Sequence, residues 1–190
     1  IKRNGKIITL VPDLYIAWHA GVSYWKNYRL LNKYSIGIEI SNPGHDYKYK
    51  SFSSKQIESI LKLSKFLIKK YKIKSKYILG HSDISPDRKK DPGEKFPWRY
   101  LSKRKISYWH DCNEKKLKNM RNKKITSLDK RLFIQNLYKI GYSRIFSKKK
   151  PKFMKILTIA FQRRFRQELI NGKIDKECLL ISNKIVKKFQ

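Results

Sequence analysis

Residues 80–93, GHSDISPDRKKDPG, contain the side chains of this sequence that most clearly suggest chemistry. His81 and Asp91 stand ten positions apart, with three cationic residues just before the aspartate. A neutral imidazole and an ionised carboxylate are both good ligands for Zn²⁺, at about 2.0–2.2 Å. A catalytic zinc normally takes three protein ligands and leaves a fourth position for water. The segment therefore predicts two zinc ligands, and the third must come from elsewhere.

A histidine and an aspartate in one loop are more often a surface pair than a metal site. The backbone around this pair favours ligation, because Gly80 precedes the histidine, Pro86 lies within the loop, and Pro92-Gly93 follows the aspartate. These residues restrict or enable particular backbone angles and could hold both side chains toward one point.

Two further residues could act at such a metal. Lys89 could present an ammonium group to an oxyanion, although from its spacing alone a solvated lysine is the better interpretation. Glu39 lies in YSIGIEIS, residues 34–41, where isoleucines alternate with other residues and predict a strand with the glutamate on the opposite face. It could be a general base for a metal-bound water or the partner of a lysine at a sheet end, and the pattern leaves both open.

The remaining histidines, His19, His45 and His110, are each expected to be structural or loop residues, because a third ligand would have to converge on the loop at 81–91. His19, in the Trp-flanked AWHAG, is the one that we expect to line a cleft.

The elements that must position these residues indicate an α/β fold. Asn4-Gly5 is a hairpin signal, followed by a predicted strand over 7–11. Strands are also predicted at 34–41 and over KYILGH, 76–81, with a helix of about five turns between them. Sites in such sheets gather at strand ends, where His81 falls.

The helix between these strands has a clear start signal. Phe52-Ser53 followed by Gln56-Ile57 has the form of a capping box with a hydrophobic staple, and apolar residues then recur at helical spacing up to Tyr71.

The sequence after residue 112 has a different character. Residues 113–126 are polar and basic and predict a linker, and three helical segments follow at about 127–140, 152–169 and 176–189. We therefore expect an α/β domain over 1–112, a basic linker, and a small three-helix domain over 127–190.

The net charge of +33 over 190 residues suggests a polyanionic partner, or else a compositional bias toward Lys, Ile, Asn, Tyr and Phe. The charge is spread over the chain: residues 1–112 carry +15 (24 basic, 9 acidic) and residues 113–190 carry +18 (23 basic, 5 acidic). No nucleic-acid-binding motif is recognised, so a nucleic-acid partner is not expected.

Four blocks, LVPDLYIAWHAGVSYW, NKYSIGIEISNPG, GHSDISPDRKKDPG and KFPWRYLSKRKISYW, together resemble the zinc N-acetylmuramoyl-L-alanine amidases of the AmpD/AmiD type. The tail, with LFIQNLYKIGY and IAFQRRFRQELINGKIDKECLLISNKIV, resembles the C-terminal peptidoglycan-binding helical module of the AmiD-like branch. The resemblance implies a mixed central sheet flanked by helices, followed by the three-helix domain.

The resemblance also implies roles for single residues. His81 and Asp91 match two of three zinc ligands, Glu39 matches the glutamate that activates water, and Lys89 matches the lysine that stabilises the tetrahedral intermediate. The third ligand would be a histidine upstream of Ile1, so we expect the sequence to be truncated at its N-terminus. Positions near the substrate are matched by His19, Asn32 and Arg88.

The implied activity is zinc-dependent hydrolysis of the amide between N-acetylmuramic acid and L-alanine in peptidoglycan or muropeptides. The alternative is a peptidoglycan-binding protein that has lost a zinc ligand and does not hydrolyse. We expect a monomer without a transmembrane segment, in the periplasm or cell envelope.

Overall fold

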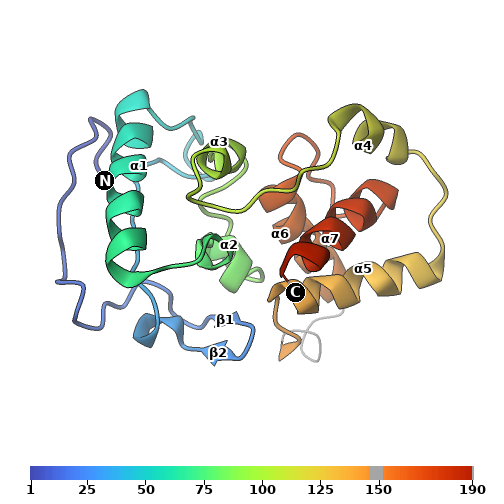
Figure 1. Cartoon of the computed structure of the whole chain (residues 1–190), viewed down its shortest axis with the longest axis horizontal. Helices are drawn as coiled ribbons and strands as arrows, with labels where there is room; N and C mark the ends of the chain where they lie inside the picture. Colours follow the sequence, from blue (N-terminus) through green and yellow to red (C-terminus); the bar gives the residue numbers. More distant parts are fainter. Residues whose placement is uncertain (146–151, 190) are drawn as a thin grey trace.

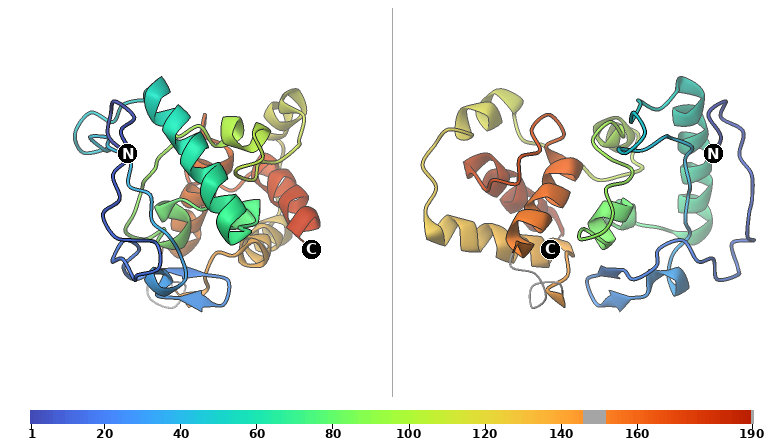
Figure 2. Two further views of the ribbon diagram at one scale, coloured as in Figure 1. Left: turned by 60° about the vertical axis from the view of Figure 1, so that its left-hand side comes forward. Right: turned by 180° about the vertical axis from the view of Figure 1, so that it is seen from behind.

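The computed structural model describes residues 1–145 and 152–189 of the chain. It has an N-terminal and a C-terminal half, with two short helices between them (Figure 1). The elements in chain order are β1 (Tyr24–Trp25), β2 (Tyr28–Arg29), α1 (Ser54–Tyr71), α2 (His81–Ile84), α3 (Trp98–Lys103), α4 (Glu114–Met120), α5 (Ser127–Ile140), α6 (Phe153–Phe165) and α7 (Lys176–Phe189). Figure 2 shows the same division from two other sides, with the start of the chain running along the outside of α1 as an irregular trace.

Helix α1 confirms the start signal read from the sequence. The backbone N–H of Gln56 donates to Ser53 Oγ at 3.1 Å, and the N–H of Ser53 donates to Gln56 Oε1 at 3.0 Å, which completes the capping box. The helix buries Ile60 and Leu67 on one face. Ile60 belongs to a small apolar core which also contains Phe96, Trp98, Leu101 and Ile106.

The predicted mixed central sheet is not confirmed. In the described residues the sheet consists of β1 and β2, a two-stranded antiparallel hairpin in which Trp25 opposes Tyr28. The segments 7–11, 34–41 and 76–81, each predicted as a strand, have no strand assignment. The strand prediction failed because an alternation of apolar and polar residues shows only that a segment could fit into a sheet. A strand forms only when its backbone pairs with the backbone of another segment.

The three segments that were predicted as strands lie at the surface or in the wall of a cleft. Residues 34–40 and 77–81 both line one cleft of about 900 Å³. Residues 7–11 lie at the surface, where Leu10 is 79% exposed. The turn predicted at Asn4-Gly5 does form, with the N–H of Gly5 donating to the carbonyl of Lys2 at 2.9 Å.

The three helices predicted in the C-terminal half are present as α5, α6 and α7. Helix α6 ends at Phe165, four residues before the predicted end at 169. The chain turns back there because Arg166 donates to the carbonyl of Leu169 at 3.0 Å and to Glu177 at 3.1 Å. These contacts stabilise a loop in place of another helical turn.

Residues 113–126, interpreted as a linker, contain α4, whose first turn is capped by Asn113. The side chain of Leu117 in this helix is buried in the main hydrophobic core. That core joins both halves, because Trp25 and Tyr108 share it with α5, α6 and α7. The division into domains at residues 112 and 126 stays a prediction.

The hairpin is fixed directly to the end of α5. Trp25 meets Tyr142 edge-to-face, with ring centroids 5.2 Å apart, and the N–H of Lys26 donates to the carbonyl of Gly141 at 2.7 Å. Gly141 has a positive φ, and a Cβ at this position would lie 2.4 Å from the Trp25 ring. The glycine therefore permits both the turn and the close approach of the two halves.

Candidate active site

His81 and Asp91 meet in the structure, as their shared loop predicted. His81 Nδ1 lies 3.1 Å from Asp91 Oδ2, and the N–H of Ser82 donates to the carbonyl of Asp91 at 2.9 Å. His81 begins the single turn of α2, so its position is fixed by the backbone on both sides of the loop. The histidine side chain is 15% exposed and the aspartate side chain 59% exposed.

The second ring nitrogen of His81 shows what the pair can bind. Nε2 lies 3.1 Å from the carbonyl oxygen of Ala20, which can only accept a hydrogen bond. A neutral ring that donates to Ala20 has an unprotonated Nδ1, and this lone pair then faces the Asp91 carboxylate. Two acceptors at this distance need a proton or a metal cation between them. Their separation is close to the ~3.3 Å edge of a tetrahedron with zinc bonds of ~2.0 Å.

The charge state of Asp91 suits ligation. Partial burial raises the pKa of Asp91, but the hydrogen bond and charge that His81 supplies when its Nδ1 is protonated, together with the charge of Lys89, outweigh burial. The pKa of Asp91 therefore lies below its ordinary value, and the carboxylate is ionised at neutral pH.

His81 and Asp91 fit two corners of a zinc site. Across residues 1–145 and 152–189, no group of three or more His, Cys, Asp or Glu side chains could hold a metal ion. The predicted third ligand, a histidine upstream of Ile1, corresponds to no described residue and stays a prediction.

Glu39, Lys89 and His19 line the same 900 Å³ cleft as His81 and Asp91. The structure therefore brings together five of the seven residues that the sequence marked for a site. The backbone carbonyl of Glu39 accepts a hydrogen bond from the terminal ammonium of Ile1 at 2.6 Å, and the residue itself is exposed. Lys89 is half-buried, and its N–H donates to the carbonyl of Ser85 at 3.0 Å.

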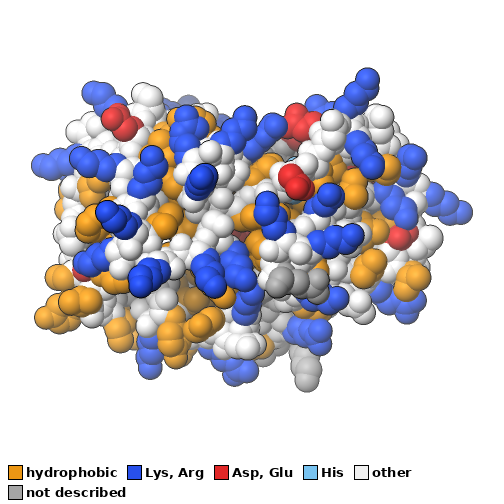
Figure 3. Space-filling view, viewed as in Figure 1, with side chains coloured by type: hydrophobic (Ala, Val, Ile, Leu, Met, Phe, Trp, Pro, Cys, Tyr) orange, Lys and Arg blue, Asp and Glu red, His pale blue; other side chains and the backbone are white. Residues whose placement is uncertain are grey.

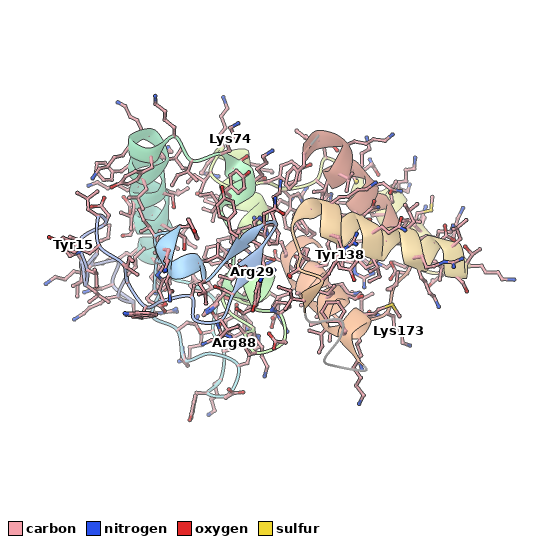
Figure 4. All side chains as sticks on the ribbon, turned by 90° about the horizontal axis from the view of Figure 1, so that it is seen from below. Tyr15, Arg29, Lys74, Arg88, Tyr138 and Lys173 are labelled. Atoms are coloured by element: carbon pink, nitrogen blue, oxygen red, sulfur yellow. The ribbon has the colours of Figure 1, made fainter. Side chains whose placement is uncertain are left out.

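Asn32 and Arg88, predicted to lie near the substrate, hold the backbone of residues 19–22. Asn32 Oδ1 accepts from the N–H of His19 at 3.2 Å and from that of Ala20 at 2.7 Å. Arg88 donates to the carbonyl of Val22 at 2.9 Å and also to that of Ala20. Figure 4 shows Arg88 beside the hairpin, on the N-terminal side of the molecule. Both side chains therefore support the carbonyl that orients His81.

The other two histidines have different surroundings. His110 is buried, its Nε2 lies 3.1 Å from the carbonyl of Phe165, and burial lowers its pKa, which agrees with the structural role expected for it. His45 lines the cleft, lies 3.0 Å from Glu94 and stacks on Tyr49 with ring centroids 4.4 Å apart. The sequence analysis missed this arrangement because Glu94 is 49 positions away in the chain.

Gly37 is a residue whose role could have been recognised from the sequence. A Cβ at this position would lie 2.5 Å from the ring of His19, so the glycine allows that ring to lie against the backbone. His19 is then held by contacts of Nδ1 with the carbonyl of Ala17 at 2.9 Å and of Nε2 with Ser35 Oγ at 3.0 Å. A glycine inside an alternating apolar run often marks such a close approach.

Basic side chains are spread over the visible face of both halves, among hydrophobic and uncharged areas, and acidic ones are few (Figure 3). The picture agrees with the even division of charge along the sequence. No helix in the described ranges combines the length and apolar character needed to cross a membrane.

The first half of the chain, residues 1–94, matches the family model described as N-acetylmuramoyl-L-alanine amidase (Amidase_2). The N-acetylmuramoyl-L-alanine amidase AmiD of Escherichia coli is 34% identical over 195 residues, which cover 99% of this chain and 70% of that protein. The chain belongs to the N-acetylmuramoyl-L-alanine amidase family.

Two further comparisons define the extent of the likeness. The 1,6-anhydro-N-acetylmuramyl-L-alanine amidase AmpD of Haemophilus influenzae is 42% identical over 104 residues, and the match covers 54% of each chain. The structure of E. coli AmiD in complex with the substrate anhydro-N-acetylmuramic acid-L-Ala-D-gamma-Glu-L-Lys superposes with a TM-score of 0.84 at 33% identity, covering 96% of this chain and 73% of that one. The chain thus spans about 70% of the AmiD length and about half of the AmpD length.

Proposed function

We propose that this protein hydrolyses the amide bond between N-acetylmuramic acid and L-alanine in peptidoglycan or muropeptides, with one zinc ion as cofactor. The observation that carries the proposal is the meeting of His81 Nδ1 and Asp91 Oδ2 at 3.1 Å in the wall of a cleft that Glu39 and Lys89 also line. The named activity of the AmiD and AmpD relatives supports the same reaction.

His81 and Asp91 would hold the zinc, together with a third ligand that the described residues do not supply. When bound, zinc supplies a Lewis acid that polarises water and the scissile carbonyl. Glu39 removes the proton from the attacking water and delivers it to the departing amine of L-alanine. The ammonium group of Lys89 stabilises the negative charge that develops on the carbonyl oxygen. His19 lies on the cleft wall and contacts the substrate, while Asn32 and Arg88 hold the loop behind it.

The extent of the similarity supports the AmiD-like branch. The match to E. coli AmiD continues through the C-terminal helices, whereas the match to the AmpD protein covers about half of this chain. We propose that the helices after residue 126 bind peptidoglycan, that the protein is a monomer, and that it works in the periplasm or cell envelope, where intact peptidoglycan is found.

The test is an amidase assay with the substrate anhydro-N-acetylmuramic acid attached to a stem peptide, on protein expressed from the native gene, with zinc measured in the same samples by elemental analysis. We expect about one zinc per chain and release of the free peptide, detected by mass spectrometry. Glu39→Gln should lower kcat by about 10²–10⁴-fold while zinc content stays unchanged. Glu58→Gln, on an exposed site of α1, is the matched control.

The alternative is a protein that binds peptidoglycan without hydrolysis. It is favoured by the single observation that the described residues contain no group of three metal-binding side chains. Absence of zinc and of peptide release, together with retained binding to peptidoglycan sacculi, would establish this alternative and contradict the hydrolase.

A further inference from the structure

The segment that carries His81 is held from behind by the C-terminal half. Arg164 in α6 is 4% exposed, and its Nη2 donates to the carbonyl of Ile78 at 2.9 Å. The guanidinium carbon of Arg164 lies 3.3 Å from the centre of the Trp98 ring, so the cation also stacks on the helix that follows the loop. The chain is thus fixed three residues before His81.

A second contact fixes the chain on the other side of His81. Asp83 Oδ2 accepts from the N–H of Gly80 at 2.8 Å, and Asp83 Oδ1 accepts from the hydroxyl of Tyr142 at 2.9 Å. Asp83 and Tyr142 are both 2% exposed. The carboxylate therefore joins the residue before His81 to the residue that follows Gly141 at the end of α5.

These contacts matter because α2 has only four residues. One helical turn is not stable by itself, so its orientation depends on what surrounds it. Metal ligands must be held within about 0.5 Å of their working geometry, and the groups that orient them affect metal affinity by about 10–100-fold.

We propose that Tyr142 and Arg164 are positioning residues for His81, and that the C-terminal half is therefore part of the support of the metal-binding loop as well as a candidate wall-binding module. The link to catalysis rests on the proposed function. The positioning itself is a property of the metal-free chain, so it can be tested separately.

The experiment compares Tyr142→Phe and Arg164→Lys with the unaltered protein. Tyr142→Phe keeps the aromatic packing and removes only the hydroxyl that Asp83 accepts from. Two-dimensional NMR of the imidazole nitrogens in the metal-free protein should show displaced His81 signals in both variants, with unchanged His110 signals in Tyr142→Phe. Hydrogen exchange of the Gly80 amide should become faster, and the Kd for zinc should rise about 10-fold.

Tyr138→Phe is the matched control, because Tyr138 lies on the same helix α5 (Figure 4) and its ring packs beside Arg144. It should leave the His81 signals, the Gly80 exchange rate and the zinc Kd unchanged within about twofold. A role in stability alone would lower the melting temperature of Tyr142→Phe but leave the His81 signals in place, and that result would overturn the proposal. If the unaltered protein binds no zinc, the hydrolase function fails, while the His81 signals still decide the positioning role.

Discussion

In the C-terminal half the side chains of Phe133, Leu137 and Phe161 are completely buried, whereas Leu10, Leu14 and Trp18 near the start of the chain are 79%, 84% and 90% exposed. Both groups are large and apolar. They differ in the kind of element that carries them. The first three lie on helices, and the others lie on segments without regular structure.

The difference follows from where each element finds its hydrogen bonds. A helix satisfies its backbone internally, so an amphipathic sequence with good caps needs only a surface to pack against. A strand needs the backbone of another segment, which local sequence does not provide. Residues 34–40 and 77–81 have strand-like patterns but line a cleft of about 900 Å³, and their apolar side chains remain partly uncovered.

The largest loss of stability is expected when a side chain in the helical core is truncated. Phe161→Ala should lower the free energy of unfolding by about 3–5 kcal/mol, because it removes a fully buried ring that contacts Phe133 edge-to-face. Trp18→Ala should change it by no more than about 0.5 kcal/mol. Urea unfolding followed by far-UV circular dichroism measures both. A cost for Trp18→Ala as large as that for Phe161→Ala would show that Trp18 is buried in solution, and the contrast would disappear.

A somewhat smaller effect is expected from a buried ion network in the C-terminal half. Arg166, 3% exposed, contacts Glu177 at 3.1 Å, and Glu177 is 2% exposed. Arg166→Met should destabilise by about 2–3 kcal/mol, because the buried carboxylate loses one of its cations. The cost stays below that of a fully unpaired charge because Arg121 still contacts Glu177 at 2.6 Å.

The control for this prediction lies in the N-terminal half. Lys90 and Asp46 are 3.6 Å apart, with side chains 58% and 81% exposed. Asp46→Asn should cost no more than about 0.5 kcal/mol in the same urea experiment. Equal costs for the two substitutions would contradict the view that burial determines what an ion pair contributes in this protein.

The helices could be predicted because their signals are local. Ser53 and Gln56 stand three residues apart and cap α1 as expected, and the α5 and α7 boundaries were predicted within a residue. The end of α6 was missed because it depends on Arg166 reaching Glu177, eleven residues further on, in the next helix. Contacts of this kind depend on the fold and leave no periodic pattern in the sequence.

In the candidate site, too, contacts within one loop could be predicted from the sequence, whereas contacts between distant segments could not. The meeting of His81 with Asp91 could be predicted because both lie in one stiff loop. The carbonyl of Ala20 that orients His81 is 61 positions away, and the hydroxyl of Tyr142 that binds Asp83 is 59 positions away. Asn32 and Arg88 were predicted to lie near the substrate, and that stays a prediction. In the structure they bind the backbone of residues 19–22, and an amide or a guanidinium can bind either backbone or ligand.

Helix caps offer a sharper comparison, because both halves use the same device. Thr126→Ala should cost about 1 kcal/mol through loss of the cap of α5. Ser53→Ala should cost somewhat more, since Ser53 Oγ also donates to the carbonyl of Arg3 at 2.7 Å and so fixes the start of the chain to α1. Urea unfolding gives both values. If Ser53→Thr keeps the stability that Ser53→Ala loses, the loss is due to the missing hydroxyl. A smaller cost for Ser53→Ala than for Thr126→Ala would mean that the contact with Arg3 contributes nothing.

The smallest expected effect concerns acid stability of the C-terminal half. The hydrogen bond from Lys176 and those from Thr126 lower the pKa of Asp129 to about 2, from its ordinary value of 3.8. The ionised form is therefore preferred in the folded state, so its contribution is fully present above pH 3.8 and is lost as the pH falls through about 2.

Asp129→Asn should remove this part of the pH dependence. The difference in unfolding free energy between the unaltered protein and the variant should be constant from pH 7 to about 4 and should shrink as the pH falls toward 2, in urea titrations at each pH. Asp46→Asn, at an exposed side chain of the N-terminal half, is the control. It should leave the decrease in unfolding free energy at acid pH unchanged. A constant difference down to pH 2 would show that the Asp129 carboxylate is not held by Lys176 and Thr126 in solution.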